Sequence, residues 1–198
     1  MPAPQERRVD PAQMPEEFRL ALRQIEAARV RPEVIIEEMP APQRIAPFAA
    51  AMSADLVIDD DELGGGRLVV LHDPAGNDAW GGTFRCVAYV RADIEPEMVT
   101  DQMLLDVGWT WLDEALHGTH ADYTAASGTV TCVSSASFGG LAKDEREAQI
   151  ELRASWTPSG DLGAHVQAWA DLMCQAAGLP PVPEGVAVLS PKGVRRPR

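Results

Sequence analysis

Residues 147–156, EAQIELRASW, alternate polar and apolar side chains over their whole length. Successive side chains of a β-strand point to opposite faces of its sheet, so this period of two predicts a strand. The apolar set forms one face: Ala148, Ile150, Leu152, Ala154 and Trp156. The other set is charged or polar throughout. We therefore predict a strand with one dry face and one solvated face.

Other segments extend this prediction to a sheet of about five or six strands. Those with alternating or β-branched patterns are 34–38, 55–59, 67–72, 82–91 and 124–134. A turn over 60–66 with three glycines, and a loop over 73–78, would join three of these strands into consecutive antiparallel hairpins. In the strand after that loop, alternation places Arg85, Tyr89 and Arg91 on the face opposite to the apolar side chains.

Apolar residues at helical spacing predict helices around these strands. One begins at Pro15 and ends before Pro32, another spans 97–117, and a last helix begins at Asp161, a residue type that caps helices well. Residues 48–52, FAAAM, are rich in helix formers and predict one further short helix.

The predicted order is helix, strand, short helix, three strands, helix, two strands, helix. It describes an α+β fold, in which helices pack on one or both faces of a mostly antiparallel sheet. We predict a single domain over 14–182, because no internal linker is long enough to separate two domains. The polar segment 1–13 is predicted to be a disordered tail, and the segment 183–198 a flexible tail with a basic end.

The chain is strongly acidic, with a formal net charge of −13 in 198 residues. Its last eight residues, PKGVRRPR, carry four positive charges, so removing these four from −13 leaves −17 for the rest. Such a body repels phosphate backbones, and we expect it not to bind nucleic acid. Only the basic tail leaves an RNA-associated function open as an alternative.

Targeting and redox signals are consistent with the cytoplasm. No stretch approaches the roughly 18 consecutive apolar residues of a membrane helix, and the first residues lack the apolar core of a signal peptide. We therefore expect a cytoplasmic protein without a membrane partner. Cys86, Cys132 and Cys174 lie within apolar periodic segments, which predicts buried thiols.

The motifs of the common catalytic and cofactor-binding sites are missing. The chain has no GxGxxG, Walker loop, HExxH, GxSxG or paired CxxC. We therefore predict no catalytic residue, no metal site and no cofactor, and favour a non-catalytic protein over an enzyme. The acidic run 59–62 could hold a divalent cation together with His72 and Asp73, but its spacing is not that of a Ca²⁺ loop.

The solvated face of the predicted sheet is the first candidate binding surface. It carries Arg85, Tyr89 and Arg91, and aromatic and arginine side chains are enriched in protein interfaces. This surface favours a non-catalytic interaction protein, chaperone-like and dimeric, with a protein partner.

A pocket beside the helix 97–117 is the second candidate. Trp109, Trp111 and His72 could line it together with the segment 124–140 and hold a small molecule, as in an enzyme or a sensor. Convergence of His72 with an acid and a hydroxyl would favour this alternative. The helical spacing of the two tryptophans instead favours core packing.

Several stretches have distinctive amino-acid sequences: 32–34, 37–38, 41–50, 71–76, 123–129, 137–140 and 154–158. Together they resemble an actinobacterial family of unknown function, DUF3000, over residues 15–182. The resemblance implies a cytoplasmic actinobacterial protein. It carries no activity, cofactor or catalytic residue onto these positions.

The order of elements is also similar to that of type III secretion chaperones and their YbjN-like relatives. The resemblance implies binding of other polypeptides through the sheet and helices, commonly as dimers. The extra strand at 34–38 departs from that order, and similar topology alone is a weak basis for shared function.

Overall fold

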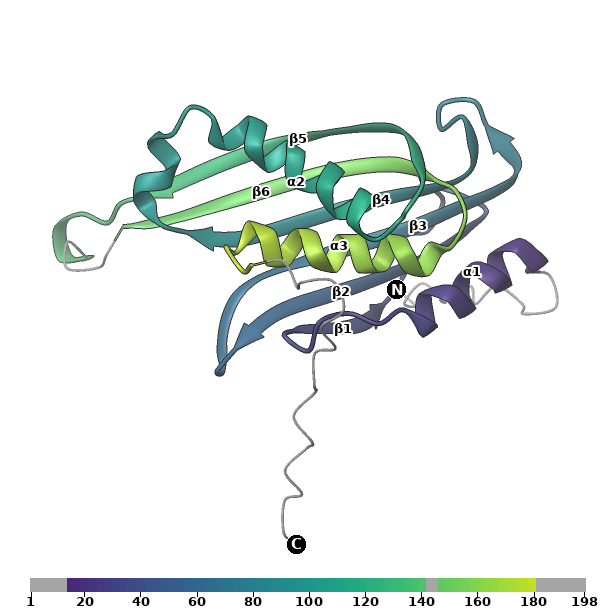
Figure 1. The fold of residues 1–198 in the computed structure, drawn as a ribbon, viewed down its shortest axis with the longest axis horizontal. Coiled ribbons are helices and arrows are strands. Elements are labelled where there is room, and N and C mark those ends of the chain that lie inside the picture. Colours follow the sequence, from purple (N-terminus) through teal and green to yellow (C-terminus); the bar gives the residue numbers. More distant parts are fainter. Residues whose placement is uncertain (1–13, 142–145, 181–198) are drawn as a thin grey trace, which may run out of the picture.

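The computed structural model describes residues 14–141 and 146–180. Its centre is an antiparallel sheet of six strands in the order β1-β2-β3-β4-β6-β5 (Figure 1). The strands are β1 (Val34–Met39), β2 (Phe48–Ile58), β3 (Asp61–Asn77), β4 (Gly82–Ile94), β5 (Tyr123–Ser135) and β6 (Glu147–Pro158). The predicted α+β fold is confirmed. The tails predicted at 1–13 and 183–198 lie outside the described residues.

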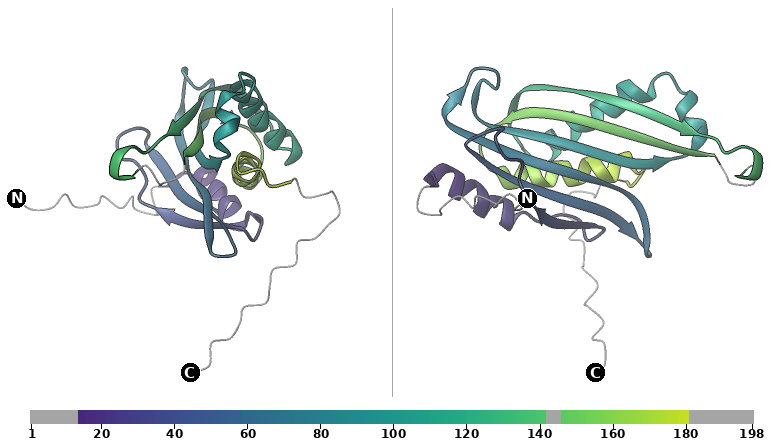
Figure 2. Two further views of the ribbon diagram at one scale, coloured as in Figure 1. Left: turned by 90° about the vertical axis from the view of Figure 1, so that its left-hand side faces the viewer. Right: turned by 180° about the vertical axis from the view of Figure 1, so that it is seen from behind.

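The described α-helices all pack on one face of this sheet (Figure 2). They are α1 (Glu16–Ala27), α2 (Leu104–Gly118) and α3 (Leu162–Ala176), with short 3-10 helices η2 (Pro96–Thr100) and η3 (Gly139–Leu141) between elements. α3 lies over β3 and β4, α2 lies over β5, and α1 packs beside α3. None of these helices is long and apolar enough to cross a membrane.

β6 confirms the alternation predicted for 147–156. Its even-numbered side chains are buried beneath the helices, whereas Glu147 and Arg153 are exposed on the other face. Fully burying a large apolar side chain contributes roughly 1.5–3 kcal/mol. The alternation therefore determines which face of β6 the helices cover.

α3 begins and ends where its sequence indicates. Asp161 is the N-cap, and its side chain accepts a hydrogen bond from the backbone N–H of Gly163 at 2.9 Å. Gly178 follows the helix with a φ of 75°, a left-handed conformation that glycine adopts at little steric cost. Between them, Trp169 and Leu172 are fully buried, so α3 supplies the centre of the core.

The predicted short helix at 48–52 is wrong, because these residues form the first part of β2. Phe48 pairs with His72 and Met52 pairs with Leu68 in the β2–β3 ladder. Alanine favours helices in isolation, but propensity is a weak preference that tertiary pairing overrides. The order of the other elements is as predicted.

The glycine run of β3 lies inside the strand rather than in the predicted turn. The turn is tighter: Asp59 and Asp60 form it, with φ values of 49° and 72°. A Cβ on Gly66 would lie 2.6 Å from the carbonyl oxygen of Tyr89 and 3.1 Å from Nε1 of Trp169 on α3. Glycine is therefore required here by the close approach of the helix and the neighbouring strand.

Two other predicted boundaries differ from the structure. The helix predicted over 97–117 begins at Leu104, because η2 occupies its first residues. β3 continues through the loop predicted over 73–78 as far as Asn77, which pairs with Gly82.

The three cysteines are free thiols. Cys86 and Cys174 are buried as predicted, whereas Cys132 is only partly buried. Burial raises the pKa of Cys174 to about 11. Since the thiolate is the nucleophile and metal ligand, such a thiol is chemically inert at neutral pH.

Gly66→Ala should lower the free energy of unfolding by about 1–3 kcal/mol, the usual cost of overpacking a core. Gly118→Ala is the control, because an added Cβ there meets no atom within 4 Å, and it should not destabilise the protein. Urea unfolding followed by tryptophan fluorescence measures both variants. Equal stabilities would contradict the close approach of α3 to β3.

Candidate functional site

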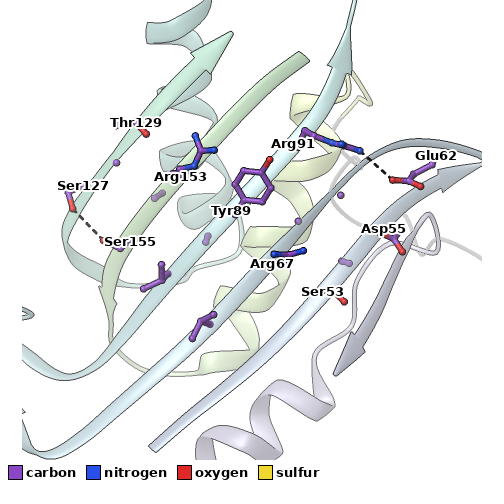
Figure 3. A pocket seen from close by; sticks show the side chains of 18 residues that line it. Ser53, Asp55, Glu62, Arg67, Tyr89, Arg91, Ser127, Thr129, Arg153 and Ser155 are labelled. Atoms are coloured by element: carbon purple, nitrogen blue, oxygen red, sulfur yellow. Dashed lines mark hydrogen bonds and ion pairs between the residues drawn. The ribbon is translucent and has the colours of Figure 1, made fainter. Parts of the chain in front are cut away.

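The helix-free face of the sheet holds an open hollow of about 1000 Å³, called the trough below (Figure 3). Strand pairing arranges its side chains in rows that run across the strands. The first row is Ser53, Arg67, Tyr89, Arg153 and Thr129. The second row is Val69, Val87, Ser155 and Ser127. The trough therefore combines cationic, aromatic, apolar and hydroxyl groups from five strands.

Tyr89 lies at the centre of the first row, between two arginines. The guanidinium carbon of Arg153 is 5.3 Å from the centroid of the Tyr89 ring, within the range of a cation–π interaction. The Tyr89 hydroxyl donates to Oε1 of Glu151 at 3.2 Å, and Arg153 pairs with the same carboxylate at 2.6 Å. Burial and this carboxylate raise the pKa of Tyr89, so its phenol stays protonated at neutral pH.

Positive charge is concentrated in the trough. Arg91 pairs with Glu62 at 3.5 Å, as Figure 3 shows. Arg67 is exposed, and no carboxylate of the described residues forms an ion pair with it. Arginines 67, 91 and 153 line the trough together with only two acids, Asp55 and Glu62. The trough is thus a cationic area on a chain whose net charge is −13.

Arg85 is on the same face of the sheet as the trough, at one end of it, and is only 8% exposed. Its side chain reaches from β4 across β6 to β5. Nη1 donates to the Ala125 carbonyl oxygen at 3.0 Å and to the Thr157 hydroxyl at 3.1 Å. Nη2 donates to the Ser155 hydroxyl at 2.6 Å and to the Ser127 hydroxyl at 3.4 Å. Arg85 therefore supports one end of the trough.

His72 is buried on the other face of the sheet, among aromatic rings. Its ring centroid is 4.1 Å from that of Phe84 and 5.7 Å from that of Phe18 on α1. Nδ1 lies 3.1 Å from the carbonyl oxygen of Thr83, and since a carbonyl only accepts, Nδ1 carries the proton. Nε2 is buried and has no hydrogen-bond partner among the described residues. His72 is thus a core residue that anchors α1.

Trp109 and Trp111 lie on α2 and are partly buried against the core. Trp109 packs on Gly128 of β5, where an added Cβ would lie 2.8 Å from Cζ3 of the indole. Neither tryptophan lines the trough. The structure does not bring His72 to them, because His72 packs against α1 and Trp109 against β5.

The acidic run at 59–62 is also far from His72. The run is at the start of β3 and His72 is about ten residues later, which at about 3.3 Å per residue separates them by roughly 30 Å. Among residues 14–141 and 146–180, no three His, Cys, Asp or Glu side chains are grouped so as to hold a metal ion.

Comparison with known proteins identifies the family. The family model described as "Protein of unknown function (DUF3000)" matches residues 14–187. The chain belongs to the DUF3000 family. No curated protein and no solved structure matches it. The similarity to type III secretion chaperones therefore stays a prediction based on the order of elements.

Sequence reasoning found part of the trough of this DUF3000 protein. Tyr89 and Arg91 line it as predicted, and Arg85 supports it at one end. Arg67, Arg153 and the serines of the second row were missed as site residues. Period-two alternation already placed Arg153 on a solvated face. What was lacking is the pairing of β4 with β6, which brings the rows together.

Stability should fall as the pH decreases below about 6.5, the ordinary pKa of histidine. Burial lowers the pKa of both His72 and His165, so the unfolded chain takes up protons that the folded chain does not. His72→Phe should make this fall shallower, by up to about 1.4 kcal/mol per pH unit. Urea unfolding between pH 5 and pH 8 measures the slope.

Phe48→Leu is the matched control for His72→Phe. It alters the same aromatic cluster without removing an imidazole, so it should change stability by a similar amount at every pH. A His72→Phe variant with the wild-type slope would contradict the assignment of a neutral, buried His72.

Proposed function

We propose that this DUF3000 protein is a non-catalytic interaction module that binds a polypeptide on its helix-free sheet face. The observation that supports this most directly is the row of Arg67, Tyr89 and Arg153, which no described helix covers. Tyrosine and arginine are enriched among the residues that carry binding energy in protein interfaces. Val69 and Val87 beside this row add apolar contact area.

The charge of the trough supports an acidic partner. Its arginines lie on a chain whose other surfaces are dominated by carboxylates, so a partner with acidic side chains is attracted to the trough and repelled elsewhere. Complementary potentials of this kind accelerate association and select among partners. We infer an acidic polypeptide segment as the occupant, in a chaperone-like role.

The setting that we propose is the actinobacterial cytoplasm, as the family resemblance implies. The alternative of a small-molecule enzyme or sensor has less support, because His72 and Trp109 lie outside the trough. The alternative of an RNA-associated protein depends on the basic segment 191–198, which lies outside the described residues.

A photo-crosslinking amino acid at Val87 should capture a polypeptide partner in cells that produce the protein natively. Val87 is 40% exposed in the trough, and Leu20 on α1, 48% exposed, is the matched control position, which should capture none. Mass spectrometry identifies the adducts. No adduct at Val87, or the same adducts at both positions, would refute a polypeptide-binding face in the trough.

Reversing the charge of the first row should weaken binding of the captured partner. Arg67→Glu with Arg153→Glu should raise its Kd at least tenfold, which corresponds to about 1.4 kcal/mol. Arg19→Glu with Arg23→Glu makes the same change on α1, where both arginines pair with Glu16, and should leave the Kd unchanged. Titration calorimetry measures both, and equal effects would contradict a specific site.

We also propose that two copies of the chain pair through the free edge of β5. β5 is an edge strand of thirteen residues without charge or proline, features that leave an edge open to pairing. β1, at the opposite edge, has six residues, two glutamates, and prolines on both sides. An uncharged strand also allows two acidic copies to approach without juxtaposing carboxylates. This supports a homodimer with one continuous sheet.

Light scattering should then give a mass of about twice the 21.4 kDa of one chain. Lysines on an edge strand oppose pairing, so Thr131→Lys with Val133→Lys should reduce the mass to that of a single chain. Ile35→Lys with Glu37→Lys on β1 is the control and should remain dimeric. A monomeric wild-type protein would exclude the proposed dimer.

A further inference from the structure

The trough has a buried positive charge at one end, without a negative partner among the described residues. Arg85 donates only to neutral oxygens, and no carboxylate of the described residues forms an ion pair with it. A guanidinium keeps its proton in proteins, even where burial lowers its pKa, as it does for Arg85. Buried charges are ordinarily paired, so an anion close to this end of the trough would be stabilised.

Two hydroxyl groups connect Arg85 to the trough. Ser127 and Ser155 both line the trough, and both accept hydrogen bonds from Nη2 of Arg85. Their oxygens are 3.4 Å apart (Figure 3). Each serine keeps its own O–H as a donor, because accepting from Arg85 uses only a lone pair. If one serine donates to the other, at least one O–H remains free to donate to a ligand in the trough, and the neighbouring cation polarises it.

Arg153 supplies a second cation beside these hydroxyls. It is two residues from Ser155 on β6, so both side chains are on the same face of the sheet. Its own carboxylate partner is Glu151, on the side away from Ser155. An anion bound at the two serines would therefore lie between Arg153 and the buried Arg85.

The geometry points to a carboxylate-binding site formed by the hydroxyls of Ser127 and Ser155, with Arg85 on one side of them and Arg153 on the other. The inference rests on the proposed function of the trough and names the group that anchors the partner, an acidic side chain of a polypeptide. A carboxylate suits the charge of the trough and its immediate partners, where four arginines (67, 85, 91 and 153) and three acids (55, 62 and 151) leave one positive charge in excess. A doubly charged phosphate would exceed that balance.

The test uses three ligands: the blocked peptide Ala-Ala-Glu-Ala-Ala, the same peptide with glutamine in place of glutamate, and sodium acetate. Each is titrated into the full chain, and binding is followed by the amide chemical shifts in NMR spectra. The glutamate peptide should shift the amides of Ser127, Gly128 and Ser155 and bind at least tenfold more tightly than the glutamine peptide. Acetate should bind more weakly than the glutamate peptide. Equal binding of both peptides would overturn the site, and acetate binding as tightly as the glutamate peptide would overturn a polypeptide source.

Ser127→Ala with Ser155→Ala should raise the Kd of the glutamate peptide about tenfold. The control is Ser134→Ala with Ser135→Ala, at the far end of β5 and outside the trough, which should leave that Kd unchanged. The dispersion of the NMR spectra shows that both variants are folded. An unchanged Kd in the first variant would also overturn the site.

Failure of this inference is distinguishable from failure of the proposed function. A partner crosslinked at Val87, together with equal binding of the two peptides, leaves the trough as a binding face and removes the carboxylate anchor. A glutamate-specific shift at Ser127 without any crosslinked partner supports the carboxylate site and refutes the proposed polypeptide partner in cells.

Discussion

The close packing of α3 on one face of the sheet is the constraint on which the rest of the structure depends. Trp169 and Met173 of α3 occupy the space above Gly66, where no side chain is present to keep them at a distance. With every described helix on this face, the six strands bury most of their apolar side chains there. The opposite face carries most of the polar and charged side chains, together with Tyr89 and a few apolar residues, and it is the face that holds the trough.

Strand pairing arranges the side chains of that face in rows. The trough residues lie between 53 and 155 in the chain, yet the ladder holds them in rows of fixed spacing. Because they are on paired strands and not on loops, little backbone freedom remains to be lost when a partner binds. The same rigidity keeps the hydroxyl pair of Ser127 and Ser155 in contact with Arg85 before any ligand arrives.

Local patterns predicted the fold class and most elements, because alternation and helical spacing are strong signals over ten or more residues. They failed at 48–52 and at the glycine run of β3, where a partner strand or a packed helix decides the conformation. The site was predictable only in part, because pairing between strands also decides which residues belong to it. Tyr89 and Arg91 follow from alternation within one strand, whereas Arg67 and Arg153 join them only through pairing between segments distant in the chain.

Arg85 has a further consequence for the edge of the sheet. β5 has an irregular start between Thr124 and Ser127, and Ala125 there has a φ of 52°, which is uncommon for a residue other than glycine. A slip of β5 by one residue along β6 would carry Ser127 to the helix side and withdraw it from the guanidinium. By binding oxygens of both strands, Arg85 holds the register of β5 on β6 and so opposes sliding of an edge strand, which has a neighbour in the sheet on one side only.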